Sequence, residues 1–106
     1  MLPYETPRDN KMTPEGKVKQ AITKFLKEQE SCWWVMPVVS GYGKPLLDYI
    51  GCSRGRFFAI EAKAPGKKPT ARQVRTLTEI ERAAGMCFVV DNVQMSELMV
   101  KWFNHD

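Results

Sequence analysis

A strand that is apolar on both faces lies in the middle of this sequence. Residues 56–63 read RFFAIEAK, and alternation puts Phe57 and Ala59 on one side, with Phe58, Ile60 and Ala62 on the other. A strand of this kind has to be covered on both faces, which is typical of a sheet that lies between layers of helices. We therefore expect an α/β fold with this strand inside the sheet.

Helical and extended patterns surround that strand in the order αβββαβα. Helices are predicted over residues 14–29, 71–84 and 94–103, where apolar residues recur at helical spacing. Strands are predicted over 33–39, 48–50, 56–63 and 86–90, with a turn from Gly51 to Gly55 and a helix stop at Gly85. Residues 1–12 hold two prolines and show no periodicity, so we expect a loose N-terminal arm followed by a single domain over 13–106.

Length and composition exclude several classes of protein. A chain of 106 residues has room for one core, and its longest mainly apolar run, 32–39, is far shorter than a membrane span of roughly 20 residues. No apolar stretch follows a basic start, which argues against a secretory signal. Three widely spaced cysteines without a CxxC pair disfavour a disulfide framework or a zinc site. We expect a cytoplasmic protein with no membrane partner.

Positive charge is concentrated in the middle of the chain. Residues 41–75 hold eight lysines and arginines but two acidic residues, so they carry net +6 in a chain whose total is +4. Such a patch suits a polyanion such as nucleic acid, although a solvated basic surface explains the charge equally well. The candidate phosphate-contacting residues are Lys44, Lys67, Lys68, Arg72 and Arg75.

The two acidic residues of that stretch, Asp48 and Glu61, are expected to meet at one end of the sheet. Glu61 and Lys63 share a strand face about 7 Å apart, and an antiparallel pairing would bring Asp48 beside Glu61. Two carboxylates favour Mg²⁺ or Mn²⁺, and a neighbouring ammonium can orient a metal-bound water and offset charge on phosphorus. The set predicts phosphodiester hydrolysis; a surface ion pair between Glu61 and Lys63 is an equally good interpretation of the spacing.

The stretch SGYGKPLLDYIGCSRGRFFAIEAKAPGKKPTARQ resembles the virus-type replication-repair nuclease (VRR-NUC) family of the PD-(D/E)XK nuclease superfamily. The resemblance extends from Glu15 to the segment AAGMCFVVDNV and includes the APGKKPT loop. It implies a restriction-endonuclease-like αβββαβ core, with a central mixed four-stranded sheet flanked by helices and an extra C-terminal helix. It also implies a Mg²⁺- or Mn²⁺-dependent DNA endonuclease that acts on Holliday junctions or other branched intermediates of replication, repair or recombination, in the cytoplasm of a bacterium or a phage-infected host.

The resemblance assigns roles to the central motif. Asp48 and Glu61 match the metal-binding acids, with the backbone carbonyl of Ala62 as a further ligand. Lys63 matches the lysine that orients the attacking water. The family usually has a proline directly before the metal-binding aspartate, where this chain has Leu47, so we expect a retained site with a slightly different loop.

Two further matches have local structural alternatives. Glu15 matches a first-helix acid that acts on the metal directly or through water, but it could also serve the helix N-terminus by its charge. It shares a helical face with Val18 and Ile22, which points it toward the sheet. Gln73 matches a glutamine that supports the lysine or contacts phosphate, yet Thr70 three residues earlier makes a capping box. We expect both roles of Gln73, in different states.

Two other classes of protein stay open: a non-catalytic nucleic-acid-binding module on the same fold, and a plain structural or interaction protein. A homodimer is also expected, because a small domain gains from association and junction-resolving enzymes pair two sites across a two-fold axis. The alternative is that the large apolar side chains all serve the core of the monomer. These side chains are Trp33, Trp34, Phe57, Phe58, Met95, Met99, Trp102 and Phe103.

Overall fold

The computed structural model describes residues 12–38 and 47–104. Within these ranges the elements follow the predicted order. They are α2 (Pro14–Lys27), β1 (Cys32–Val35), β2 (Tyr49–Ser53), β3 (Arg56–Ala62), α3 (Ala71–Arg82), β4 (Met86–Val90) and α4 (Glu97–Phe103). The strands form one sheet in the order β1-β2-β3-β4, antiparallel from β1 to β3, with β4 parallel to β3. The described chain is therefore an α/β structure with a mixed four-stranded sheet. Most of the predicted N-terminal arm, residues 1–11, lies outside the described residues.

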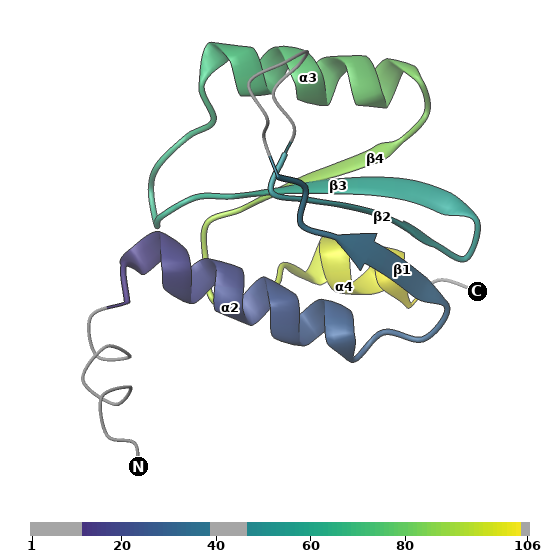
Figure 1. The fold of residues 1–106 in the computed structure, drawn as a ribbon, viewed down its shortest axis with the longest axis horizontal. Coiled ribbons are helices and arrows are strands. Elements are labelled where there is room, and N and C mark those ends of the chain that lie inside the picture. Colours follow the sequence, from purple (N-terminus) through teal and green to yellow (C-terminus); the bar gives the residue numbers. More distant parts are fainter. Residues whose placement is uncertain (1–11, 39–46, 105–106) are drawn as a thin grey trace.

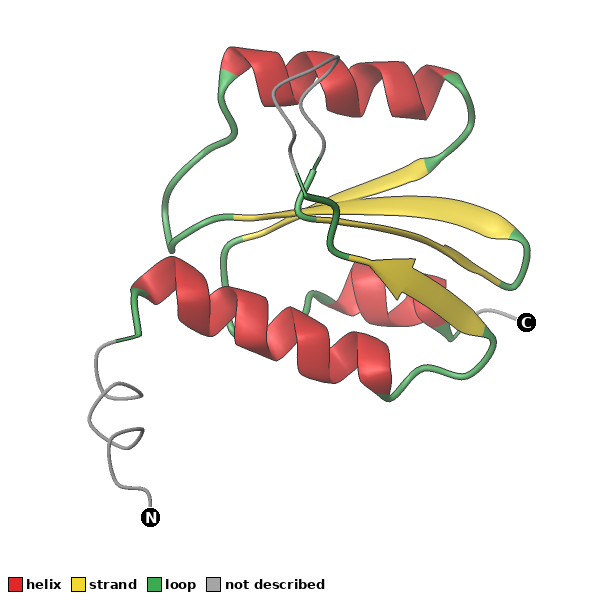
Figure 2. Ribbon diagram, in the orientation of Figure 1, coloured by secondary structure: helices red, strands yellow, loops and turns green. Residues whose placement is uncertain are grey.

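The sheet separates one helix from the other two. In Figure 1, α3 covers one face, while α2 and α4 lie against the opposite face. Figure 2 shows the same three layers, with the strands between the helices. β3 is paired on both sides and its residues 58–62 are all buried, as the two-sided apolar pattern predicted. The sheet is thus covered on both faces along this central strand.

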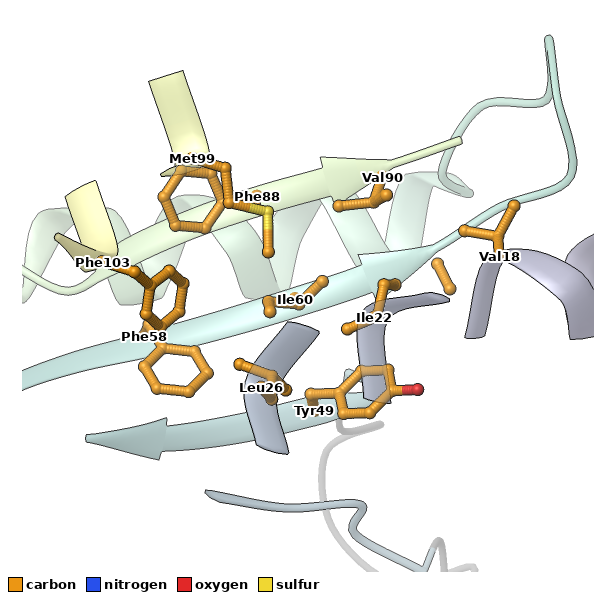
Figure 3. Packing of buried hydrophobic residues seen from close by; sticks show 11 residues of the cluster. Val18, Ile22, Leu26, Tyr49, Phe58, Ile60, Phe88, Val90, Met99 and Phe103 are labelled. Atoms are coloured by element: carbon orange, nitrogen blue, oxygen red, sulfur yellow. The ribbon is translucent and has the colours of Figure 1, made fainter. Parts of the chain in front are cut away.

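The larger of two apolar clusters lies between the sheet and the α2–α4 layer. Figure 3 shows Ile22 of α2 and Phe103 of α4 converging on Phe58 and Ile60 of β3. The smaller cluster lies under α3, where Leu77 packs with buried residues of the sheet and of the segment before β2. Because burial of apolar area drives folding, this packing fixes how α2 and α3 sit on the strands. That placement in turn decides which polar side chains meet at the ends of the strands.

The predicted turn at Gly51 is wrong. Gly51 lies inside β2, directly opposite Trp34 of β1, and a Cβ at this position would collide with the Trp33 carbonyl oxygen. The chain reverses at Arg54 and Gly55 instead, where φ is 52° and 83°. Two successive positive φ angles are what a two-residue type I′ hairpin requires. Gly51 therefore provides room for close strand approach, and Gly55 provides the turn.

Several element ends also differ from the prediction. α2 ends at Lys27, β1 at Val35, and α4 begins at Glu97 after the N-cap Ser96. At the end of α3, Ala84 takes the left-handed conformation with φ 72°, and the Gly85 N–H donates to the Ile80 carbonyl at 2.9 Å. The helices within 12–38 and 47–104 include none with the length and apolar character needed to cross a membrane.

Candidate active site

The antiparallel pairing of β2 and β3 brings Asp48 and Glu61 together, as expected. Tyr49 pairs with Ile60, so the next residues outward, Asp48 and Glu61, face each other across the two strands. The Ala62 N–H donates a 2.8 Å hydrogen bond to Asp48 Oδ2, which fixes the aspartate against β3. Two carboxylates therefore meet at the end of the sheet from which the chain leaves β3 for α3 (Figure 1).

Among the charged residues at this end of the sheet, Glu61 is the least exposed, with 3% of its surface accessible to solvent. Its Oε2 accepts a 2.6 Å hydrogen bond from Gln73 Nε2 and lies 3.4 Å from Lys63 Nζ. Burial raises the pKa of the Glu61 carboxyl, and the charge of Asp48 raises it further; Lys63 and the Asp48 backbone N–H act in the opposite direction without cancelling the effect. An added cation at this position would favour the ionised form.

Gln73 serves its helix and the site at the same time. Its Oε1 accepts from the Thr70 N–H at 2.9 Å, and the Thr70 hydroxyl accepts from the Gln73 N–H at 3.2 Å, which completes a capping box. Its Nε2 points the other way and donates to Glu61. The capping role is confirmed, and it occurs together with a bond to Glu61; the predicted support of Lys63 or contact with phosphate stays a prediction. The start of α3 is therefore tied directly to the acidic pair.

Lys19 belongs to the site although it was not among the predicted site residues. Its Nζ lies 3.5 Å from Asp48 Oδ1 and 3.5 Å from Glu15 Oε2. Burial lowers the pKa of Lys19, but the charges of Asp48 and Glu15 outweigh that effect and leave its pKa raised. The four-residue spacing between Glu15 and Lys19 was the available signal, because residues at i and i+4 share a helix face. Glu15 is thus connected to Asp48 through Lys19.

The oxygen donors at this end of the sheet suit a hard divalent cation. Asp48 and Glu61 supply carboxylates, and the Ala62 N–H donates to Asp48; the Ala62 backbone carbonyl as a further ligand stays a prediction. No three His, Cys, Asp or Glu side chains within 12–38 and 47–104 are grouped closely enough to hold a metal ion. Glu15 is 42% exposed and bound to Lys19, which leaves its predicted contact with a metal, direct or through water, as a prediction.

The loop and the helix that follow Lys63 in the chain carry exposed basic side chains. The loop between β3 and α3 follows directly after Lys63, and its turn is closed by a hydrogen bond from the Lys67 N–H to the Ala64 carbonyl at 2.9 Å. Four of the five predicted phosphate-contacting residues are exposed on this loop and on the first turns of α3: Lys67, Lys68, Arg72 and Arg75. The fifth, Lys44, lies outside the described residues.

One basic residue of the charged stretch has a different role. The Arg56 guanidinium donates to the Trp102 carbonyl at 3.0 Å and lies 4.3 Å from the centre of the Trp102 ring. It therefore joins the start of β3 to α4, away from the loop that carries Lys67. Arg56 accounts for part of the charge excess without adding to the surface beside Glu61.

Comparison of the sequence with models of known protein families and with curated proteins gives no match. The resemblance to the VRR-NUC family stays a prediction based on the motif residues.

Proposed function

We propose that this protein is a metal-dependent DNA endonuclease with a restriction-endonuclease-like core. One observation carries the proposal: Asp48 and Glu61 face each other across β2 and β3, with the Lys63 ammonium 3.4 Å from Glu61. A buried acid is costly in a domain of this size unless a cation or a function compensates it. The observed order of elements, αβββαβ followed by a final helix, supports the same proposal.

Asp48, Glu61 and the Ala62 carbonyl would hold Mg²⁺ or Mn²⁺, with Glu15 contributing directly or through water. When bound, the cation supplies Lewis acidity toward the phosphate and a water of lowered pKa. Lys63 then orients the attacking water and offsets the negative charge that develops on the phosphate oxygens. Gln73 acts as a positioning residue, because its 2.6 Å hydrogen bond to Glu61 fixes one carboxylate oxygen.

The substrate that we propose is branched DNA, such as a Holliday junction or another intermediate of replication, repair or recombination. Lys67, Lys68, Arg72 and Arg75, with Lys44, would contact backbone phosphates and would not read bases. The proposed location, which follows from the resemblance, is the cytoplasm of a bacterium or a phage-infected cell. Two copies paired across a two-fold axis would present two sites to two strands.

A non-catalytic nucleic-acid-binding module on the same fold is the second candidate. It is favoured by the ion pairs of the site, since Lys19 already contacts Asp48 and Lys63 already contacts Glu61. In that case the carboxylates would be structural, and the basic loop alone would act. The two candidates differ in whether the protein needs a divalent cation for its activity.

Nicking of supercoiled plasmid in Mg²⁺ or Mn²⁺, with and without EDTA, separates the candidates. We expect nicking that EDTA abolishes and that Asp48→Asn and Glu61→Gln lose. Glu97→Gln, an equal change at an exposed position on α4, is the matched control and should nick normally. DNA binding without metal-dependent nicking would support the binding module. A panel of junctions, flaps and nicked duplexes then tests the preference for branched substrates.

A further inference from the structure

Lys19 is the charged residue of the site to which the proposed reaction gives no role. We propose that Lys19 is a built-in counter-cation of the metal-free site, which competes with the divalent cation for Asp48 and Glu15 and so sets the metal affinity. The inference rests on the proposed function, because it concerns the same carboxylates. It concerns the affinity of the site for the metal ion, which neither Lys63 nor Gln73 explains.

The two oxygens of Asp48 have different partners. Oδ2 accepts the hydrogen bond from the Ala62 N–H at 2.8 Å, whereas Oδ1 lies 3.5 Å from the Lys19 ammonium. Oδ1 is therefore the oxygen not engaged by β3, and it is the one that Lys19 covers. A divalent cation and an ammonium at one carboxylate oxygen repel each other. Binding of the metal at Oδ1 requires the ammonium to move away.

The position of Lys19 is built into the packing of α2 on β2. Tyr49, which follows Asp48 directly, is fully buried, and its hydroxyl donates to the Lys19 backbone carbonyl at 2.8 Å. The same hydroxyl is 2.9 Å from Thr23 Oγ1, one helical turn further along. The backbone of Lys19 is thus fixed next to the strand that presents Asp48. Packing therefore holds the backbone of Lys19 within reach of Asp48, and the rotamer of the lysine side chain decides whether the ion pair forms.

The ammonium groups of Lys19 and Lys63 differ in how easily each can move away from its carboxylate partner. The side chains of Lys63 and Glu61 are 14% and 4% exposed, whereas those of Lys19 and Asp48 are 36% and 22% exposed. Lys63 is confined beside its partner, which suits a group that stays in place during a reaction. Lys19 can turn its flexible stem toward solvent without leaving a buried charge behind. It is therefore the ammonium that metal binding displaces.

A titration with Mn²⁺ alone, followed by electron paramagnetic resonance of the free ion, tests the competition. Lys19→Met should bind Mn²⁺ about three- to tenfold more tightly, the factor expected when metal binding no longer has to break two partly exposed ion pairs. Lys19→Arg keeps the charge and should bind like the wild type. Lys24→Met removes the same charge from an exposed position of the same helix and should also match the wild type.

Melting without DNA gives a second readout. Without metal, Lys19→Met leaves Glu15 and Asp48 without their ammonium partner and should melt below the wild type, while its rise in melting temperature on adding Mn²⁺ should be larger. The Tyr49 bond to the Lys19 carbonyl involves the backbone and survives the substitution. If Lys19→Met does not fold, Lys19→Gln makes the same comparison with a polar side chain.

The outcomes separate this inference from the proposed function. If the wild type and Asp48→Asn both bind no Mn²⁺, the metal site of the proposed function is wrong. If the wild type binds Mn²⁺ and Asp48→Asn does not, but Lys19→Met binds no more tightly than Lys24→Met, the proposed function stands and the role of Lys19 is overturned. Tighter binding by Lys19→Met, with unchanged binding by Lys19→Arg, supports the competition.

Discussion

The negative charge of Glu61 is unfavourable for folding, but the proposed function requires it. We expect Glu61→Gln to lose at least about 100-fold in cleavage, since even the outer partners of a metal ligand contribute 10- to 100-fold. Without metal, the variant should melt higher by roughly 2–5 °C, the size of shift that under 1 kcal/mol produces in such a domain. The reason is that burial and Asp48 raise the pKa of Glu61, while an amide can still accept from Gln73.

Calorimetry in EDTA and plasmid nicking in Mg²⁺ measure the two halves of that prediction. Glu97→Gln, on the exposed side of α4, should nick normally, and Glu30→Gln, at an exposed position outside the helices, should leave the melting temperature unchanged. A Glu61→Gln protein that melts below the wild type would show that Lys63 and Gln73 more than compensate the buried carboxylate. Cleavage at the wild-type rate would remove Glu61 from the site.

Lys63 is expected to act on the reaction more than on the metal. Lys63→Ala should lower turnover by about 100- to 1,000-fold, the range for removing one donor that stabilises developing charge, and should change Mn²⁺ affinity little. Single-turnover cleavage across a metal titration measures both quantities. Normal turnover at saturating metal, combined with weaker metal binding, would contradict the role given to Lys63.

At the scale of single residues, the sequence was sufficient to predict those site residues whose positions follow from strand pairing. The alternation of RFFAIEAK and a short antiparallel connection were enough to bring Asp48, Glu61 and Lys63 together. Lys19 was not predicted, because its contact with Asp48 depends on how α2 lies across β2. That packing is a tertiary property, whereas Glu15 and Lys19 show only that they share a helix face.

Among the elements, the loop from β3 to α3 carries two of the residues proposed to contact DNA, Lys67 and Lys68. The double variant Lys67→Ala/Lys68→Ala should weaken duplex binding and flatten the log–log salt slope by about 0.9 for each phosphate that the protein no longer neutralises. Fluorescence anisotropy over a range of salt concentrations measures the slope. Lys24→Ala/Lys27→Ala, an equal change of charge on α2, should leave it unchanged. An unaltered slope in the loop variant would place the DNA elsewhere.

The packing of α3 on β4 predicts a pH-dependent reactivity. Burial, with a smaller effect from Glu81, raises the pKa of the Cys87 thiol from 9.0 to about 11, and its Sγ donates to the Leu77 carbonyl at 3.6 Å. Because the native state holds this proton longer than the unfolded chain, the thiol's contribution to stability falls as the pH rises from 9.0 toward 11. In iodoacetamide labelling followed by mass spectrometry at pH 8, Cys87 should react far more slowly in the folded protein than in the same protein unfolded in urea. Equal rates in the folded and the unfolded protein would mean that α3 opens readily.

Element types were easier to predict than the functions of individual glycines. All seven helices and strands of the described ranges have the predicted type, since apolar periodicity determines which face is buried. Gly51 was predicted as part of a turn because glycine most often marks one, but it lies inside β2, where close approach of β1 excludes a Cβ. Such an approach depends on pairing between distant segments, and the local sequence does not encode it.

For the molecule as a whole, the large apolar side chains divide into two sets. Met99, Phe103 and Phe58 are buried, and Trp34 and Trp102 pack against them, so α4 serves the core of the monomer. That outcome weakens the part of the homodimer prediction that relied on α4. Trp33, Cys52 and Phe57 instead form a row of directly paired residues across β1, β2 and β3. Trp33 is 65% exposed and Phe57 is 44% exposed.

We expect this row to be the centre of the homodimer, since a second copy would bury aromatic area that the monomer leaves in water. Light scattering at micromolar concentration should give about twice the 12.2 kDa of one chain. Trp33→Glu places a charge in the row and should give monomers that keep their fold, because Trp33 is mostly exposed. Leu98→Glu, at a 73% exposed apolar position on α4, is the matched control and should stay dimeric.

Junction cleavage in the Trp33→Glu monomer should drop to nicking of one strand, since the paired cut needs two sites on one substrate. A 12.2 kDa wild type that cuts both strands of a junction would contradict the dimer.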